Sequence, residues 1–308
     1  MTPRFEIHRM NTCSLYEDGV KKSMKILDLR DEMTYNEEEK EGDHVKKGVA
    51  IWNYHRGGDI HAENMGNARC FHDHGFDAVS WLGSEFDHMT EEQVQELTAW
   101  LKESGQTLTV HHILPDPDRV EACRYFEEAL VRMANWQKRY GLITGLTFDF
   151  WYDRARMLPY LKKALDEFRG LGVFLACEDN PLDDAAMESF APYITAEDDY
   201  GILIDLGHMN MRHTRWEKRS AQDFQDAFTG LPLKLREIHV SDNLGLKDDH
   251  SYLHFGTLPV TDIVSALQNI GFDGIVTIEI VNHNWTLDEH RGHAVETAQE
   301  LCDALSAK

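Results

Sequence analysis

The chain has 308 residues, 42% of them hydrophobic and 28% charged, so it can bury a sizeable core as a soluble globular protein. Its 31 Lys and Arg residues face 54 Asp and Glu residues, and the formal net charge of −23 opposes binding to nucleic acid or to an anionic membrane. We expect a cytoplasmic protein, because the five cysteines form no C-x-x-C pair, no leader-like segment opens the chain, and no apolar run approaches the ~18 residues of a membrane span.

Residues 1–48 differ in composition from the rest of the chain. Residues 4–12 and 22–36 are candidates for two short strands, and the charge-rich stretch NEEEKEGDHVKKG follows them. We predict an N-terminal extension over residues 1–48, with a β-hairpin as one interpretation. It would either cap the domain that follows or contact another subunit, in a homo-oligomer or with a different partner.

From Val49 onward, short apolar runs alternate with helical patterns. Thr90 and Gln93 form a capping box, and Gly105 follows the last helically spaced apolar residue. A longer amphipathic pattern follows Pro117 and ends at Gly141. We predict eight strands, at residues 49–55, 76–83, 108–114, 145–152, 173–179, 201–207, 235–241 and 275–281.

These predicted strands are continuously apolar, which is typical of parallel strands buried on both faces. Eight such βα units in about 260 residues predict an α/β fold, a (β/α)8 TIM barrel over residues 49–308 with the extension before it. The alternative is an open doubly wound sheet, which more often carries a glycine-rich phosphate turn after its first strand. The segment HRGGD, at residues 55–59, lacks that motif's glycine spacing.

Potential metal ligands end the last four predicted strands. They are Glu178, Asp205, His239 and Glu279, each about one βα unit from the next. Active sites of such barrels lie at these strand ends. Three carboxylates and one imidazole suit a hard divalent cation, with Mn²⁺ favoured and Mg²⁺, Co²⁺ or Zn²⁺ as alternatives. Such an ion polarises a carbonyl and acidifies the neighbouring C–H, and two opposed carboxylates then exchange the proton.

Other polar and aromatic side chains are expected to contact a substrate. His111 and His112 are adjacent in a strand, so only one of them can face the site, and we assign His112. Trp81 is a candidate for an aromatic wall against the apolar face of a sugar. Asp242 and His250 complete the predicted set, in the segment that follows the seventh strand.

Three segments carry a resemblance to a known family: IDLGHMN, IHVSDNLGLKDDHSYLHFG and ALQNIGFDGIVTIEI, at residues 204–210, 238–256 and 266–280. They resemble the xylose isomerase-like TIM-barrel superfamily of sugar-phosphate isomerases and epimerases. The group includes ketose 3-epimerases, hydroxypyruvate isomerase, inosose dehydratase and the apurinic endonucleases. The resemblance covers roughly residues 49–305 and is strongest after Glu178.

The resemblance assigns roles to individual residues. It implies that Glu178, Asp205, His239 and Glu279 are the metal ligands, that Glu178 and Glu279 are the acid/base pair, and that His208 contacts substrate. One local feature differs from ketose 3-epimerases, and another resembles the endonuclease branch of the family. Those enzymes usually carry an arginine shortly after the strand-seven histidine, where this chain has Asn243, Leu244 and Gly245. The Asp248-x-His250 pair resembles the D-x-H that supplies extra metal ligands in the endonuclease branch.

These patterns and the resemblance together predict a function. We expect a divalent-metal-dependent isomerase or epimerase that moves a proton next to the carbonyl of a small carbohydrate. A lyase that eliminates water or an aglycone after the same proton abstraction is the first alternative. An apurinic-endonuclease-like phosphodiesterase and a non-catalytic binding or scaffold subunit are the others.

Overall fold

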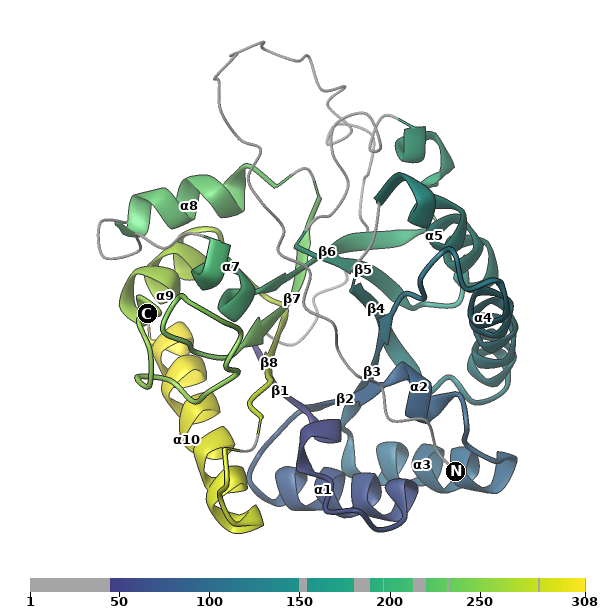
Figure 1. Cartoon of the computed structure of the whole chain (residues 1–308), viewed down its shortest axis with the longest axis horizontal. Coiled ribbons are helices and arrows are strands. Elements are labelled where there is room, and N and C mark those ends of the chain that lie inside the picture. Colours follow the sequence, from purple (N-terminus) through teal and green to yellow (C-terminus); the bar gives the residue numbers. More distant parts are fainter. Residues whose placement is uncertain are drawn as a thin grey trace. The chain divides into compact units, whose positions relative to one another are not determined.

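A closed barrel of eight parallel strands forms the centre of the domain, and the strands neighbour one another in chain order (Figure 1). The computed structural model describes residues 45–149, 154–179, 189–195, 197–212, 220–231, 233–281 and 283–307. The strands are β1 Lys46–Ala50, β2 Ala78–Leu82, β3 Thr107–Ile113, β4 Ile143–Asp149, β5 Phe174–Glu178, β6 Asp199–Asp205, β7 Leu235–Val240 and β8 Ile275–Ile278. The predicted (β/α)8 barrel is confirmed. The predicted hairpin falls on residues 1–44, outside the described residues.

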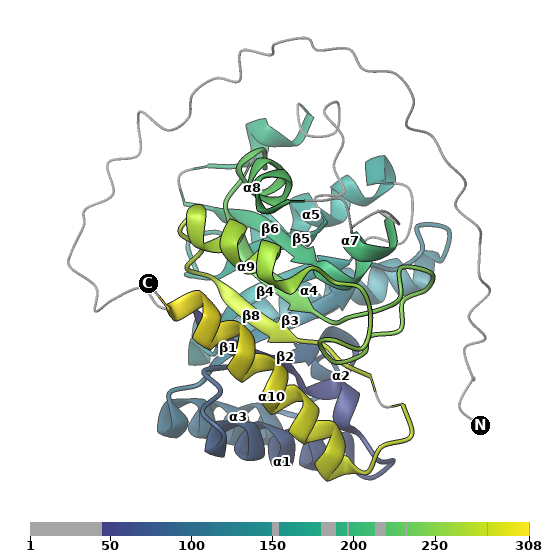
Figure 2. The same ribbon diagram turned by 90° about the vertical axis from the view of Figure 1, so that its left-hand side faces the viewer.

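Helices surround the ring of strands (Figure 1). Figure 2 shows α10 lying along the outside of β1 and β8. Short helical turns directly follow three of the strands: η1 Ile51–Tyr54 after β1, α2 Gly83–Phe86 after β2 and α7 Leu206–Arg212 after β6. A further short turn, η2 Ala191–Tyr193, precedes β6. The longer helices are α1 Ile60–Asp73, α3 Glu91–Ser104, α4 Val120–Tyr140, α5 Arg154–Phe168, α8 Ala221–Thr229, α9 Val260–Asn269 and α10 Leu287–Ser306.

The expected helix signals are present around α3. Thr90 and Gln93 form the reciprocal capping box, and Gly105 ends the helix with a φ of 74°. Gly141 ends α4 in the same left-handed conformation. Only a residue without a Cβ adopts this backbone readily, so the two glycines fix where the chain turns back toward β3 and β4.

The first strand differs from its predicted span of 49–55. Strand β1 pairs with β8 from Lys46 to Val49, and residues 51–54 leave the sheet as the helical turn η1. Lys46 and Lys47, which the sequence pattern placed in the extension, are therefore part of the barrel. Their charges interrupted the apolar pattern, which concealed the start of the strand.

The barrel interior changes character along its axis. Apolar side chains close one end, where Ala78, Phe174, Ala176, Leu203 and Ile275 form a separate cluster. The larger core lies between the sheet and the helices. Nearer the carboxyl ends of the strands the inward side chains are polar, so this end of the barrel is available for a site.

No helix of the described residues is long and apolar enough to cross a bilayer.

Candidate metal centre

The four predicted ligands come together at the carboxyl ends of β5 to β8. Glu178 ends β5, Asp205 ends β6, His239 lies in β7, and Glu279 directly follows β8. The register of β6 and β7 places Asp205 beside His239. Asp205, His239 and Glu279 each offer a ligand atom within 4.8 Å of the others, and Glu178 forms a second such group with His239 and His111.

The geometry of these side chains fits a cation better than it fits direct hydrogen bonding. Nδ1 of His239 lies 2.7 Å from Oε2 of Glu279, yet neither nitrogen of His239 has a partner with hydrogen-bond geometry within the described structure. Oδ2 of Asp205 and Oε1 of Glu178 are also buried and lack one there. Buried polar atoms of this kind are rare in folded proteins. A bound metal ion would use the lone pairs of these unpartnered nitrogen and oxygen atoms.

Burial and charge act differently on the two glutamates. Burial raises the pKa of Glu178 well above its usual value, and the neighbouring Asp149 adds to the effect. Burial is the largest single influence on Glu279 and would raise its pKa, but the charge and hydrogen bond of His239, together with the charges of His250 and His111, outweigh it and lower this pKa to about 2. Without a bound metal, Glu178 therefore keeps its proton to a higher pH than Glu279 does.

His208 and His250 lie beside the four strand ends. Nδ1 of His208 is 2.7 Å from Oε1 of Glu178, and its Nε2 is 3.1 Å from Oδ2 of Asp248. The same oxygen of Asp248 lies 2.7 Å from Nε2 of His250. Nδ1 of His250 lies 2.9 Å from the backbone carbonyl of Glu279 and donates to it. The segment after β7 thus folds back over the candidate centre.

His111, and not His112, faces the barrel interior. Nε2 of His111 is 3.6 Å from Oε2 of Glu178, and its ring lies 5.1 Å from that of His239. The ring of His112 packs on the opposite face of β3, 5.3 Å from Phe126 of α4. The assignment of His112 as a substrate contact is therefore corrected. The signal was present in TLTVHHI, where the polar residues Thr107, Thr109 and His111 alternate with apolar ones and so share a face.

Trp81 is likewise remote from the strand-end cluster. Its side chain is buried between the barrel and the helices, edge-on to Phe86 of α2 with ring centroids 6.5 Å apart. Among the described residues, an aromatic side chain beside the site is that of Trp52, in η1, whose ring stacks on His111 at 5.7 Å and an interplanar angle of 13°. Trp81 was expected at the end of β2, but its position in the strand alternation directs it outward.

Asp242 has a structural role. It is buried, and its Oδ1 accepts hydrogen bonds from the backbone N–H groups of Asn243 and Leu258, while Oδ2 accepts from Gly256. These contacts fold the segment from 242 to 258 back on itself. Gly256 is required here, because a Cβ at this position would lie 1.9 Å from the carbonyl oxygen of Asn243. The predicted contact of Asp242 with a substrate stays a prediction beside this structural role.

We expect Asp242→Asn to destabilise the protein by on the order of 3 kcal/mol, because the amide nitrogen of asparagine cannot accept the bond from Gly256 and faces that donor with one of its own. Chemical denaturation at equilibrium measures the free energy of unfolding. The matched control is Asp73→Asn, an exposed substitution at the end of α1. Equal unfolding midpoints for the two variants would contradict the role assigned to Asp242.

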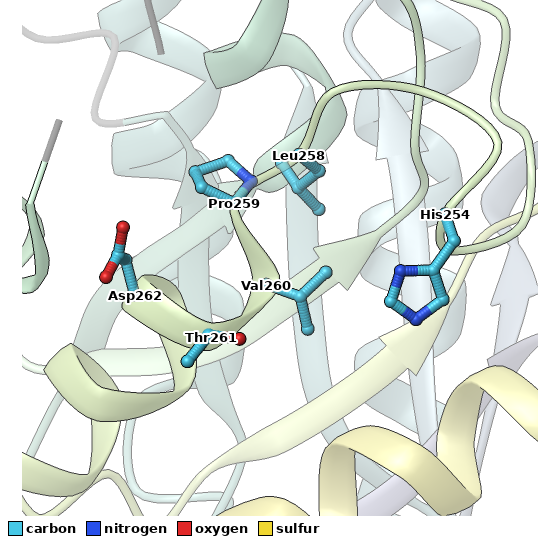
Figure 3. Close-up of a pocket in the computed structure, with 6 residues that line it drawn as sticks. All are labelled: His254, Leu258, Pro259, Val260, Thr261 and Asp262. Atoms are coloured by element: carbon cyan, nitrogen blue, oxygen red, sulfur yellow. The ribbon is translucent and has the colours of Figure 1, made fainter. Parts of the chain in front are cut away.

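A surface hollow elsewhere has different chemistry. It lies at the start of α9 and is lined by His254, Leu258, Pro259, Val260, Thr261 and Asp262 (Figure 3). His254 is largely exposed and pairs with Glu300 of α10 at 2.7 Å. None of the four predicted metal ligands lines this hollow. The strand-end cluster therefore remains the candidate centre.

Comparison with solved structures supports the fold. A D-tagatose 3-epimerase-like protein superposes with a TM-score of 0.62 at 17% identity, covering 85% of this chain and 97% of that one. D-psicose 3-epimerase from Clostridium cellulolyticum H10 gives a TM-score of 0.57 at 17% identity, with 85% and 98% covered. A xylose isomerase domain protein from Alicyclobacillus acidocaldarius gives 0.61 at 14% identity, with 85% and 100% covered.

Sequence comparison identifies the family. An uncharacterised protein of Methanocaldococcus jannaschii is 27% identical over 82 residues, which span 27% of this chain and only 26% of that protein. The family described as "Xylose isomerase-like TIM barrel" matches residues 69–307. Because that match covers most of the barrel and well over half of the protein, the chain belongs to the xylose isomerase-like TIM barrel family.

Proposed function

We propose that the protein is a divalent-metal-dependent isomerase or epimerase of a sugar or a related polyol-carbonyl compound. The observation that carries the proposal is the convergence of Asp205, His239 and Glu279 within 4.8 Å of one another, with Glu178 beside them. The family and the sugar 3-epimerases among its structural neighbours support the same class of reaction.

In this proposal Glu178, Asp205, His239 and Glu279 hold the metal, with Mn²⁺ favoured over Mg²⁺, Co²⁺ and Zn²⁺. The bound metal would polarise the substrate carbonyl and acidify the adjacent C–H. Glu279, ionised in the protein as it stands, accepts the proton, and Glu178, whose pKa is raised, returns one to the opposite face or to the neighbouring carbon. His208 and His250 orient the substrate hydroxyls.

The surroundings of the centre favour an unphosphorylated substrate. The described contacts of Glu178, His208, His239 and Glu279 are with carboxylates, imidazoles and backbone groups, and none is with a lysine or arginine. A phosphate group generally requires such a cation or a helix N-terminus. The stacked ring of Trp52 offers a surface for the apolar face of a sugar.

Isotope exchange tests the proposal. After elemental analysis of the purified protein for bound metal, ketoses, inososes and glycosides are incubated with the metal-loaded protein in D₂O, and the recovered compounds are analysed by NMR. We expect deuterium at a carbon next to the carbonyl. A metal-loaded protein that exchanges no proton in any of these compounds would contradict the proposal and favour a binding or scaffold role.

The same screen separates the proposed reaction from a lyase. A lyase would release water or an aglycone after abstracting the same proton, so its product would lack the β-substituent. An isomerase or epimerase product keeps the composition of its substrate. The NMR spectrum of the recovered compound distinguishes the two outcomes directly.

One observation favours a second candidate, a metal-dependent phosphodiesterase. His208 and His250 both contact the same oxygen of Asp248, and Asp205, His208 and His250 form a group able to hold a further ion. A hydrolase of the endonuclease type would bind three zinc ions per chain and cleave abasic DNA. The net charge of −23 opposes DNA binding, so we rank this candidate second.

A further inference from the structure

A second buried carboxylate lies one row deeper in the barrel than the candidate metal centre. Glu237 precedes His239 by two positions in β7, so both side chains lie on the same face of the strand and point inward. Both are fully buried. The proposed proton transfer does not use Glu237, and the resemblance to known enzymes assigns it no role.

The described surroundings of Glu237 supply one hydrogen-bond donor to its carboxylate. Thr277 of β8 donates a hydrogen bond from Oγ1 to Oε1 of Glu237 at 2.5 Å. Space for this pair comes from Gly48 of β1, where a Cβ would lie 2.8 Å from Oγ1 of Thr277. The other oxygen, Oε2, is buried without a hydrogen-bond partner among the described residues. Burying a carboxylate is unfavourable unless a positive or strongly polarised donor compensates it, and the single hydroxyl of Thr277 does not provide that compensation.

Among the described residues, the nearest group able to act as such a donor is the imidazole of His239, although its Nε2 does not have hydrogen-bond geometry toward Glu237 in the structure. Its Nε2 lies 3.4 Å from Oε1 of Glu237, while its Nδ1 lies 2.7 Å from Oε2 of Glu279. The two ring nitrogens therefore face different groups. Nδ1 faces the candidate metal centre, and Nε2 faces away from it, toward Glu237.

We propose that Glu237 is a positioning residue for the metal centre. Its Oε1 lies 3.4 Å from Nε2 of His239, and with a metal at Nδ1 it would accept the Nε2–H and so keep the Nδ1 lone pair directed at the metal. Carboxylates commonly fix the tautomer and ring orientation of a metal-bound histidine in this way. The inference rests on the proposed metal centre and adds to it the residue that sets which nitrogen of His239 is the ligand.

Cobalt binding tests this role without any sugar turnover. Glu237→Gln keeps the shape of the side chain but replaces the carboxylate with a weaker, neutral acceptor. We expect the full-length variant to bind Co²⁺ about 10–100-fold more weakly than the unaltered protein and with a changed visible absorption spectrum. The matched control, Glu103→Gln on the exposed face of α3, should bind Co²⁺ with unchanged affinity and spectrum. Unaltered affinity and spectrum in Glu237→Gln would overturn the proposal.

A measurement on the unaltered protein covers the case in which Glu237→Gln does not fold. In the Zn²⁺-loaded protein labelled with ¹⁵N-histidine, long-range ¹H–¹⁵N NMR spectra show which ring nitrogen of His239 carries the proton. We expect the proton on Nε2 and the metal on Nδ1. The reverse arrangement would rule out the assigned role of Glu237.

These outcomes also distinguish this inference from the proposed function. A protein that binds Co²⁺ with the expected dependence on Glu237, but exchanges no sugar proton, supports the positioning role and removes the isomerase proposal. A protein that binds neither Co²⁺ nor Zn²⁺ overturns both.

Discussion

Glu279→Gln is expected to lower the rate of deuterium incorporation at saturating metal by on the order of 10²–10⁴-fold. Glutamine keeps an oxygen that can contact a metal, but it cannot accept a proton. Glu279 is the member of the carboxylate pair that ionises at lower pH, because the nearby imidazoles, His239 above all, together outweigh the effect of burial and lower its pKa to about 2. Mass spectrometry of the recovered substrate, taken over time in D₂O, gives the exchange rate.

Metal binding has to be separated from proton transfer in this experiment. The exchange rate is therefore measured over a range of metal concentrations, and only its plateau is compared. Glu103→Gln, which makes the same chemical change on the exposed surface of α3, should retain the full rate. A plateau for Glu279→Gln equal to that of the control would show that another group abstracts the proton.

Divalent metal is expected to raise the melting temperature of the protein by on the order of 5 °C at a concentration about 100 times the dissociation constant. The physical reason is that a cation that binds only the folded state offsets the cost of burying Glu178 and Asp205, whose pKa values are raised. Asp205→Asn is expected to abolish this shift. Its Oδ1 keeps the hydrogen bond from the backbone N–H of His208, while the unpartnered Oδ2 becomes an amide nitrogen that cannot bind a metal.

A second prediction for Asp205→Asn concerns the melting temperature without metal, which we do not expect to fall. Burial raises the pKa of Asp205, and the charge of Glu279 raises it further, so a neutral side chain at this position relieves an unfavourable interaction. We expect metal-free Asp205→Asn to melt at or above the temperature of the metal-free unaltered protein. Thermal scans with excess chelator and with added metal give both values. An equal metal-induced shift in the variant and the unaltered protein would exclude Asp205 as a ligand.

The barrel itself was predictable because its determinants are local. Continuous apolar runs, the capping box at Thr90 and the glycines at 105 and 141 each act within a few residues, and together they give the βα period. The start of β1 was not predicted, because what determines it is not local. Lys46 and Lys47 belong to the strand through pairing with β8, about 230 residues away in the sequence, and no local signal records that pairing.

The sequence predicts which residues lie at the carboxyl ends of the strands. It does not reliably predict toward which face of the sheet a side chain points. The positions of Glu178, Asp205 and His239 were predictable because every barrel strand presents the residues at its carboxyl end at the same rim, while their role as ligands stays a prediction. His112 and Trp81 were misplaced because one position of register decides whether a side chain faces the interior or the helices. The backbone contacts of Asp242 were not predictable from the sequence. Two of its three donors are residues 256 and 258, which come near Asp242 only when the segment folds.

The candidate ligands all come from β5 to β8, whereas the Trp52 and His111 stack comes from the opposite half of the barrel. The segments that follow β1 to β4 therefore supply none of the four predicted ligands. Exchanging the segments that follow β1 to β4 for those of another barrel would alter which substrates fit while leaving the carboxylate and imidazole cluster in place. New substrate preferences could then be selected in this scaffold without rebuilding its chemistry.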